Sequence, residues 1–165
     1  RRKMVTDTIK EVIRRLHDVM DPEIPFLNVM EMGMVREVVQ EGSTLVIRIT
    51  PTYSGCPATD VIAEDVLAAA KTVHLDSRTE IVLTPAWTTD WIGEEARLKM
   101  AEHGIAPPTG QSADKAFLLG KDRITPCPLC KSSDTHMVSA FGSTACKAHF
   151  QCNVCLEPFD HFKCI

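Results

Sequence analysis

The sequence predicts an α+β protein: a compact α/β domain with a small, mostly antiparallel or mixed sheet, followed by a small cysteine-rich β domain. Two observations support this prediction. Helical and strand-like apolar patterns alternate over roughly the first hundred residues. Six of the seven cysteines fall after residue 126. We therefore expect domains at 1–106 and 125–165, joined by a linker at 107–124.

The first helix is expected between a threonine cap and a proline-rich run. Thr8 with Glu11 forms a capping-box pattern, and Thr6 is an alternative cap. The two prolines within 21–25 cannot continue a helix, so it should end there. The apolar residues at helical spacing are Ile9, Val12, Ile13, Leu16 and Met20.

A hairpin should follow this helix. Residues 34–39 and 44–50 have strand patterns, and 41–43 is a glycine-containing turn between them. In the second strand, apolar residues alternate with others, which predicts one more deeply buried face of the sheet. The residues on that face are Leu45, Ile47 and Ile49.

The rest of the first domain should contain two helices and one strand. Residues 58–73 form the first of these helices, with Ile62, Val66, Ala69 and Val73 on its inner face. Residues 80–83 form the third strand. Residues 91–103 form the last helix, which Thr89 or Asp90 caps and Gly104 ends. The linker that follows is mixed and polar apart from the apolar triplet 117–119.

Composition excludes several function classes. The formal net charge is −4, from 18 basic and 22 acidic residues, without the basic run expected of a nucleic-acid surface. The longest apolar stretches are too short for a membrane span. We expect no signal peptide, because no apolar block follows the basic start. The odd number of cysteines and the Cys-x-x-Cys pairs favour a reducing cytoplasm over a disulfide scaffold.

The clearest chemistry lies in two Cys-x-x-Cys pairs near the C-terminus. Each pair allows two thiolates of one turn to reach the same ion, and two such turns make a tetrahedral four-sulfur zinc site. The spacer between the pairs has room for a hairpin, with 136–141 leading out and 149–151 leading back. We therefore predict a small β zinc ribbon built on structural Zn²⁺, with ligands Cys127, Cys130, Cys152 and Cys155.

Other interpretations of these cysteines remain open. Redox motifs or disulfides are one alternative, although a redox pair normally opens a helix and residues 131–134 offer no helical face. An iron–sulfur cluster on the same ligands is another. Cys146 and Cys164 are expected to be small buried side chains. The functional alternative is a second metal site or a reversible disulfide. His136, His149 and His161 could also ligate, but are expected to be partly exposed strand residues.

Cys56 is a candidate functional thiol in the first domain. Pro57 suits the first position of a helix, which would place Cys56 at the cap, where the helix dipole should lower its pKa. A cysteine that simply packs under the loop explains the position equally well. Asp21 and Glu23 are expected either to cap backbone amides in a turn or to share a metal with the thiolate.

The two tryptophans form a third candidate. Trp87 and Trp91 flank an expected helix start. They suit a core and cap, and a partner surface is the alternative. No arrangement for acid–base or nucleophilic catalysis emerges, so we do not expect an enzyme.

Several phrases of the first domain are distinctive: Asp21-Pro22-Glu23-Ile24-Pro25, Gly33-Met34-Val35, residues 50–57 and residues 85–91. With them, this domain resembles the iron–sulfur assembly α/β domain of sulfur-mobilisation accessory proteins and cytosolic targeting factors. The tail adds the phrases at residues 141–148 and 157–164. With this tail, the whole chain resembles the PaaD family of accessory subunits of phenylacetyl-CoA epoxidase.

The resemblance implies a maturation role in aerobic phenylacetate catabolism. The factor would assist iron–sulfur cluster assembly or insertion in the epoxidase, above all in its iron–sulfur flavin reductase. Cys56 would handle transient iron or a cluster, with Asp21 and Glu23 alongside. Because one cysteine cannot hold a cluster alone, a homodimer, a partner or Cys146 and Cys164 would add ligands.

Two further hypotheses remain. In the first, the chain is a non-catalytic, zinc-dependent interaction module of the same complex, which binds through the ribbon and the surface of Trp87 and Trp91. In the second, it is a thiol oxidoreductase that uses Cys146 and Cys164.

Overall fold

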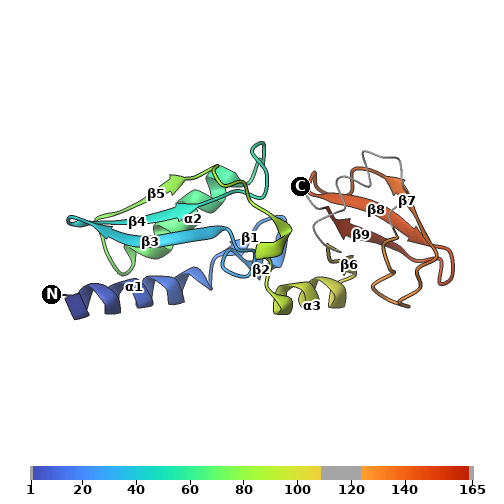
Figure 1. Ribbon diagram of the computed structural model, residues 1–165, viewed down its shortest axis with the longest axis horizontal. Helices are drawn as coiled ribbons and strands as arrows, with labels where there is room; N and C mark the ends of the chain where they lie inside the picture. The colour runs from blue at the N-terminus through green and yellow to red at the C-terminus, as the bar shows by residue number, and fades with distance from the viewer. Residues whose placement is uncertain (1, 109–123, 164–165) are drawn as a thin grey trace. The chain divides into compact units, whose positions relative to one another are not determined.

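The computed structural model describes residues 2–108 and 124–163 (Figure 1). It shows the mixed α+β class that the sequence predicts. The chain divides into two compact units, Arg1–Trp87 and Thr88–Ile165, here called the N-terminal and C-terminal units. This division falls earlier than the predicted boundary at 106. No helix in the described parts of the chain has the length and apolar character needed to cross a membrane.

The N-terminal unit contains two helices, a three-stranded sheet and a short separate hairpin. The hairpin pairs β1 with β2. In the sheet the order is β3-β4-β5, with β3 antiparallel and β5 parallel to β4. The elements are α1 (Arg2–Leu16), β1 (Met20–Asp21), β2 (Ile24–Asn28), β3 (Val35–Glu41), β4 (Thr44–Ile49), α2 (Thr59–Lys71) and β5 (Ser77–Ile81).

The core of this unit lies between the sheet and the helices. Helix α2 packs on β4 and β5 and also contacts α1 (Figure 1). Ile62, Val66 and Ala70 are the buried residues of α2. Leu45, Ile47 and Ile49 of β4 are buried as predicted, but Val46 and Thr50 are equally buried, so the expected difference between the two faces holds only at Arg48. The hairpin β3–β4 is confirmed, and Gly42 makes its turn at φ +63°.

The opposite face of the sheet carries an ion-pair network. Arg48 at its centre contacts Glu37, Glu41 and Glu80. Arg78 bridges Glu41 and Glu80. These pairs lie at least partly in solvent, so they contribute modestly to stability and mainly keep this face polar.

Three expectations for this unit were wrong in detail. Helix α1 begins at Arg2, so Thr8 lies inside it rather than at its cap. The stretch after the helix contains the two short strands β1 and β2 rather than only a turn. Strand β5 begins at Ser77, before the predicted position 80. Short apolar runs give weak signals of where strands begin.

In its described residues, the C-terminal unit contains a short 3-10 helix, one α-helix and a four-stranded sheet. The strand order is β6-β9-β8-β7; β6 runs parallel to β9, and the other neighbours are antiparallel. Its elements are η1 (Thr89–Trp91), α3 (Glu94–Glu102), β6 (Ile105–Ala106), β7 (Thr135–Ser139), β8 (Lys147–Cys152) and β9 (Pro158–Phe162).

The predicted last helix is divided in two. Ile92 and Gly93 are extended, so α3 begins only at Glu94, with Gly93 as its cap, rather than Thr89 or Asp90. Thr88 instead caps η1 by accepting a hydrogen bond from the Asp90 amide. Gly104 ends α3 at φ +75°, as predicted. Most of the predicted linker, including the triplet 117–119, lies outside the described residues.

Candidate functional site

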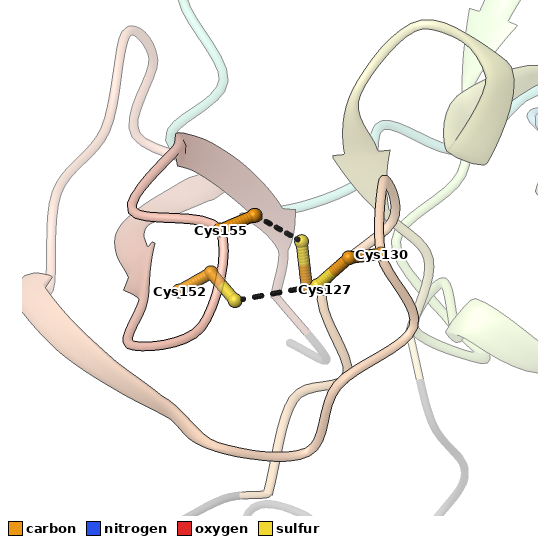
Figure 2. A group of neighbouring side chains, drawn as sticks. All are labelled: Cys127, Cys130, Cys152 and Cys155. Carbon is orange, nitrogen blue, oxygen red and sulfur yellow. Dashed lines mark hydrogen bonds between the residues drawn. The ribbon is translucent and has the colours of Figure 1, made fainter.

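Four cysteines meet at one end of the C-terminal sheet (Figure 2). Their sulfurs all lie within 4.8 Å of one another. Cys127 and Cys155 Sγ are 3.8 Å apart, and Cys130 and Cys152 Sγ are 3.5 Å apart. Sulfurs bound at about 2.3 Å to a tetrahedral zinc ion lie about 3.8 Å from one another. The arrangement therefore fits the predicted four-sulfur metal site, without disulfides among these residues.

Both metal-binding turns are held by backbone hydrogen bonds. In the first, the Lys131 amide donates to the Cys127 carbonyl at 3.0 Å, and in the second the Cys152 amide donates to the Glu157 carbonyl at 3.1 Å. Lys131 and Leu156, each just after the second cysteine of a pair, have φ of 63° and 65°. This left-handed backbone lets the chain turn away after each pair.

The turn amides also tune the thiols. Hydrogen bonds from the amides of Cys155 and Val154 lower the pKa of Cys152 to about 7. The distance from Val154 N to Cys152 Sγ is 3.4 Å. At Cys155 the Glu157 amide acts in the same direction, but lost solvation and the neighbouring sulfurs outweigh it and raise the pKa to about 12. A cation bound among these sulfurs would displace the protons that the thiols still carry.

The spacer hairpin is confirmed, and a further strand was missed. Strands β7 and β8 pair as the two predicted arms. Strand β9, in the tail, completes the sheet beside β8. Its apolar pattern is short and interrupted by Asp160 and His161, so it gave no strand signal. Together these strands position the second cysteine pair beside the first.

The three histidines stay outside the metal site. In the described parts of the chain, the four cysteines are the group whose ligand atoms come close enough to share an ion. His136 Nδ1 contacts Asn153 Oδ1 at 2.8 Å, and His149 Nδ1 lies 3.4 Å from Asp160 Oδ1. His161 is 1 % exposed, contrary to the expectation of a partly exposed residue, and its Nδ1 contacts the Ala106 carbonyl.

Cys146 is buried in the C-terminal unit. It is 3 % exposed, and its sulfur lies 3.0 Å from the Thr144 hydroxyl. Its partner in the proposed disulfide, Cys164, lies outside the described residues. The burial agrees with the expectation of a small packed side chain.

Cys56 sits in the loop between β4 and α2. It is partly buried and lies two residues before Ala58, which caps α2, so Cys56 is not at the helix cap as expected. Burial raises the pKa of the Cys56 thiol, and the charges of Glu23 and Asp21 raise it further. The Ala58 amide and the Thr59 side chain favour the thiolate, but their combined effect is smaller. The expected lowering of this pKa by the helix dipole was therefore wrong.

Asp21 and Glu23 come from the β1–β2 hairpin. Asp21 is 6 % exposed, and its Oδ1 accepts hydrogen bonds from the amides of Glu23 at 2.7 Å and Ile24 at 3.0 Å. Asp21 thus holds the turn, as the first of the two interpretations predicts. Through their negative charges both carboxylates raise the pKa of Cys56, although they belong to a separate loop. The three side chains do not form a compact ligand group in the described residues.

Trp87 belongs to the core rather than to a surface. It is 3 % exposed, and its Nε1 donates to the Met32 carbonyl at 2.9 Å. Trp91 is partly exposed. A paired tryptophan surface is therefore excluded, because Trp87 packs inside the N-terminal unit.

Comparison with known proteins assigns a family to each part. Residues 9–82 match the family described as iron-sulfur cluster assembly protein, and residues 111–163 match the family described as PaaD zinc beta ribbon domain. An Escherichia coli protein, provisionally named as one of the subunits of 1,2-phenylacetyl-CoA epoxidase, is 46% identical over 95% of this chain and 93% of its own length. The chain belongs to the PaaD family. The resemblance inferred from the sequence is thereby confirmed.

Two other relatives cover only part of this PaaD-family chain. A Porphyromonas gingivalis protein named Fe-S protein maturation auxiliary factor is 36% identical over 56% of the chain and 90% of its own length. A crystal structure of a domain of unknown function from Bacillus anthracis has a TM-score of 0.55 and 23% identity, and covers 61% of this chain and 97% of its own. That likeness supports the fold.

Proposed function

We propose that this chain is a non-catalytic accessory factor of phenylacetyl-CoA epoxidase that assists iron–sulfur cluster assembly or insertion. The client would be the iron–sulfur flavin reductase of the complex, and the setting is the cytoplasm during aerobic phenylacetate catabolism. Relatives named as a maturation factor and as an epoxidase component support this role.

The electrostatic influence of two carboxylates on the partly buried Cys56 thiol carries the proposal. The thiol is partly buried, and Glu23 and Asp21 lie close enough to raise its pKa. A thiolate beside carboxylates favours a bound cation. Iron bound at this loop would therefore offset the repulsion between their negative charges. We propose that Cys56 contacts iron or a cluster as cargo, with Glu23 and Asp21 supplying negative charge.

Cargo holding at this loop would be brief. One thiol cannot hold a cluster by itself, and ferredoxin-type clusters need four protein ligands. The remaining ligands would come from the client or from a second copy of this chain. Such a site can receive iron and release it, since few of its bonds must break on transfer.

The ribbon would serve this role as a rigid, zinc-stabilised platform. Cys127, Cys130, Cys152 and Cys155 would hold Zn²⁺, which supplies the folding energy that so small a unit lacks. Four sulfur ligands would leave no open position for a substrate on the metal, so the zinc would be structural.

Expression of the epoxidase subunits with and without this chain tests the proposal. The reductase made without it should contain less iron and less acid-labile sulfide per polypeptide. Equal iron and sulfide in both preparations would contradict a maturation role. Metal analysis of the purified chain should give about one zinc, with additional iron only in anaerobic preparations.

A second function rests on the exposed metal end of the ribbon. Leu129, Val154 and Leu156 are between 55% and 67% exposed, and each lies within or just after a cysteine pair. Leu156 also adopts φ +65°, a backbone conformation unfavourable for leucine. These features favour a zinc-dependent interaction module that binds epoxidase subunits through the exposed apolar side chains of the two cysteine turns. Such binding is compatible with the maturation role.

A further inference from the structure

The loop that carries Cys56 begins with a hydroxyl that has no hydrogen-bond partner. Thr50 is 1 % exposed, and its Oγ1 is the buried side-chain polar atom left unpaired among the residues that the structure describes. A buried hydroxyl without a partner is destabilising relative to a paired one. Valine has nearly the same shape without the hydroxyl, so stability alone does not favour threonine here.

The backbone of Thr50 is firmly placed. Its amide donates to the Met34 carbonyl at 2.8 Å, which ties the end of β4 to the start of β3. The neighbouring Thr52 is also buried, at 6 % exposure. From there the chain runs directly to Cys56, whose amide donates to the Tyr53 carbonyl at 3.2 Å. Thr50 is therefore the firmly held first residue of a short loop that leads to the Cys56 thiol.

We propose that the Thr50 hydroxyl is a positioning group that gains its hydrogen-bond partner when the Cys56 loop takes up iron or an iron–sulfur cluster. The inference rests on the proposed function of Cys56. In the empty protein the hydroxyl remains unpaired. When the loop closes on its cargo, the hydroxyl bonds a loop or cargo atom and holds the loaded form in place. The unpaired hydroxyl raises the free energy of the empty form. Loading of iron or a cluster therefore becomes more favourable.

Two variants of the full-length chain, Thr50→Val and Thr50→Ser, test what the hydroxyl does in the empty and in the loaded protein. We expect Thr50→Val to melt at the same or a higher temperature than the parent protein, because no hydrogen bond is lost. Iron and sulfide transfer to apo-reductase, followed anaerobically by the visible absorbance of its cluster, should slow by about tenfold, the effect of one hydrogen bond to a charged group. Thr50→Ser keeps the hydroxyl and should retain most of the transfer rate.

Cys56→Ser in the same assay separates failure of this inference from failure of the proposed function. If Thr50→Val transfers at the parental rate while Cys56→Ser does not transfer, the inference is overturned and the function of Cys56 stands. If Thr50→Val melts well below the parent, the hydroxyl is already paired in the empty protein, for example to a buried water, and the inference is overturned. If Cys56→Ser transfers normally, both proposals fail together.

Discussion

Glu23 lies close enough to Cys56 for its carboxylate to raise the pKa of the thiol, although the two residues belong to separate loops. Burial acts in the same direction and is the largest cause. The empty loop therefore keeps Cys56 mainly protonated at neutral pH. A cation at this loop would displace that proton and neutralise part of the surrounding charge, which suits a site that loads and releases iron.

Glu23→Gln should make Cys56 more reactive. Removing one negative charge lowers the thiol pKa, so iodoacetamide should alkylate Cys56 about threefold faster at pH 7. Peptide-resolved mass spectrometry of the zinc-loaded protein measures this rate for Cys56 alone. Glu64→Gln removes an exposed carboxylate from α2 and should leave the rate unchanged.

The rate of Cys56 alkylation should increase with pH beyond neutrality. Because the pKa of Cys56 is raised, its thiolate is scarcer at neutral pH than that of an unperturbed cysteine. The alkylation rate should still be rising, by about tenfold per pH unit, when a model thiol of pKa about 8.5 has reached its plateau. A plateau at or below neutral pH would contradict the electrostatic account of this loop.

Removal of the ribbon's metal should unfold only part of the chain. A strong chelator, or Cys152→Ser, removes a contribution on the order of 10 kcal/mol to the folding of the four-cysteine unit. Limited proteolysis should then cut within β7, β8 and β9, while peptides from α2 stay protected. Acidification should speed the loss of zinc, since protons compete for the thiolates. Unchanged protease resistance after complete removal of metal would disprove a structural zinc site.

Leu156→Asn tests whether the metal end of the ribbon binds a partner. Asparagine tolerates positive φ better than leucine, so stability should stay equal or rise by up to about 1 kcal/mol. Capture of the co-expressed reductase should nevertheless weaken, because an exposed apolar anchor is lost. Leu98→Asn changes a leucine of α3 that is 57% exposed and serves as the control. Equal capture by both variants would argue against an apolar contact at the two cysteine turns.

Asp160 should be a stability centre of the ribbon sheet. It accepts a hydrogen bond from the Ser143 hydroxyl at 2.8 Å and lies 3.8 Å from the buried Lys147 ammonium. Asp160→Asn leaves that ammonium without its opposite charge, so denaturant unfolding should show a loss of about 1–3 kcal/mol. Asp134→Asn alters an exposed hydrogen bond to Asn153 and should cost less than about 1 kcal/mol. Similar losses in both variants would contradict this role.

The sequence predicted those parts of the structure that local patterns encode. Residues 34–50 form the expected hairpin because their alternation and the turn at Gly42 agree. The four metal-site cysteines come together because paired spacing in two turns leaves little freedom. The family resemblance also followed from short phrases, and the comparisons support it.

Other features depend on contacts between distant segments, which the sequence does not display. The environment of Cys56 is one example: helix position alone suggested a lower pKa, whereas burial and the carboxylates of another loop raise it. Trp87 is another, since only the fold shows that its indole reaches the Met32 carbonyl. The sequence likewise does not reveal that the Thr50 hydroxyl lacks a hydrogen-bond partner, because this depends on how strand β4 and the loop bury it.

The most direct test of the account is cluster loading of the reductase in the presence of Cys56→Ser. The full set of epoxidase subunits would be expressed with this variant, and iron and acid-labile sulfide would be measured per reductase polypeptide. Ser54→Ala, an exposed hydroxyl in the same loop, is the matched control. The account predicts that Cys56→Ser lowers both values to those found without the chain, while Ser54→Ala leaves them at the parental level. Full iron and sulfide with Cys56→Ser would contradict it.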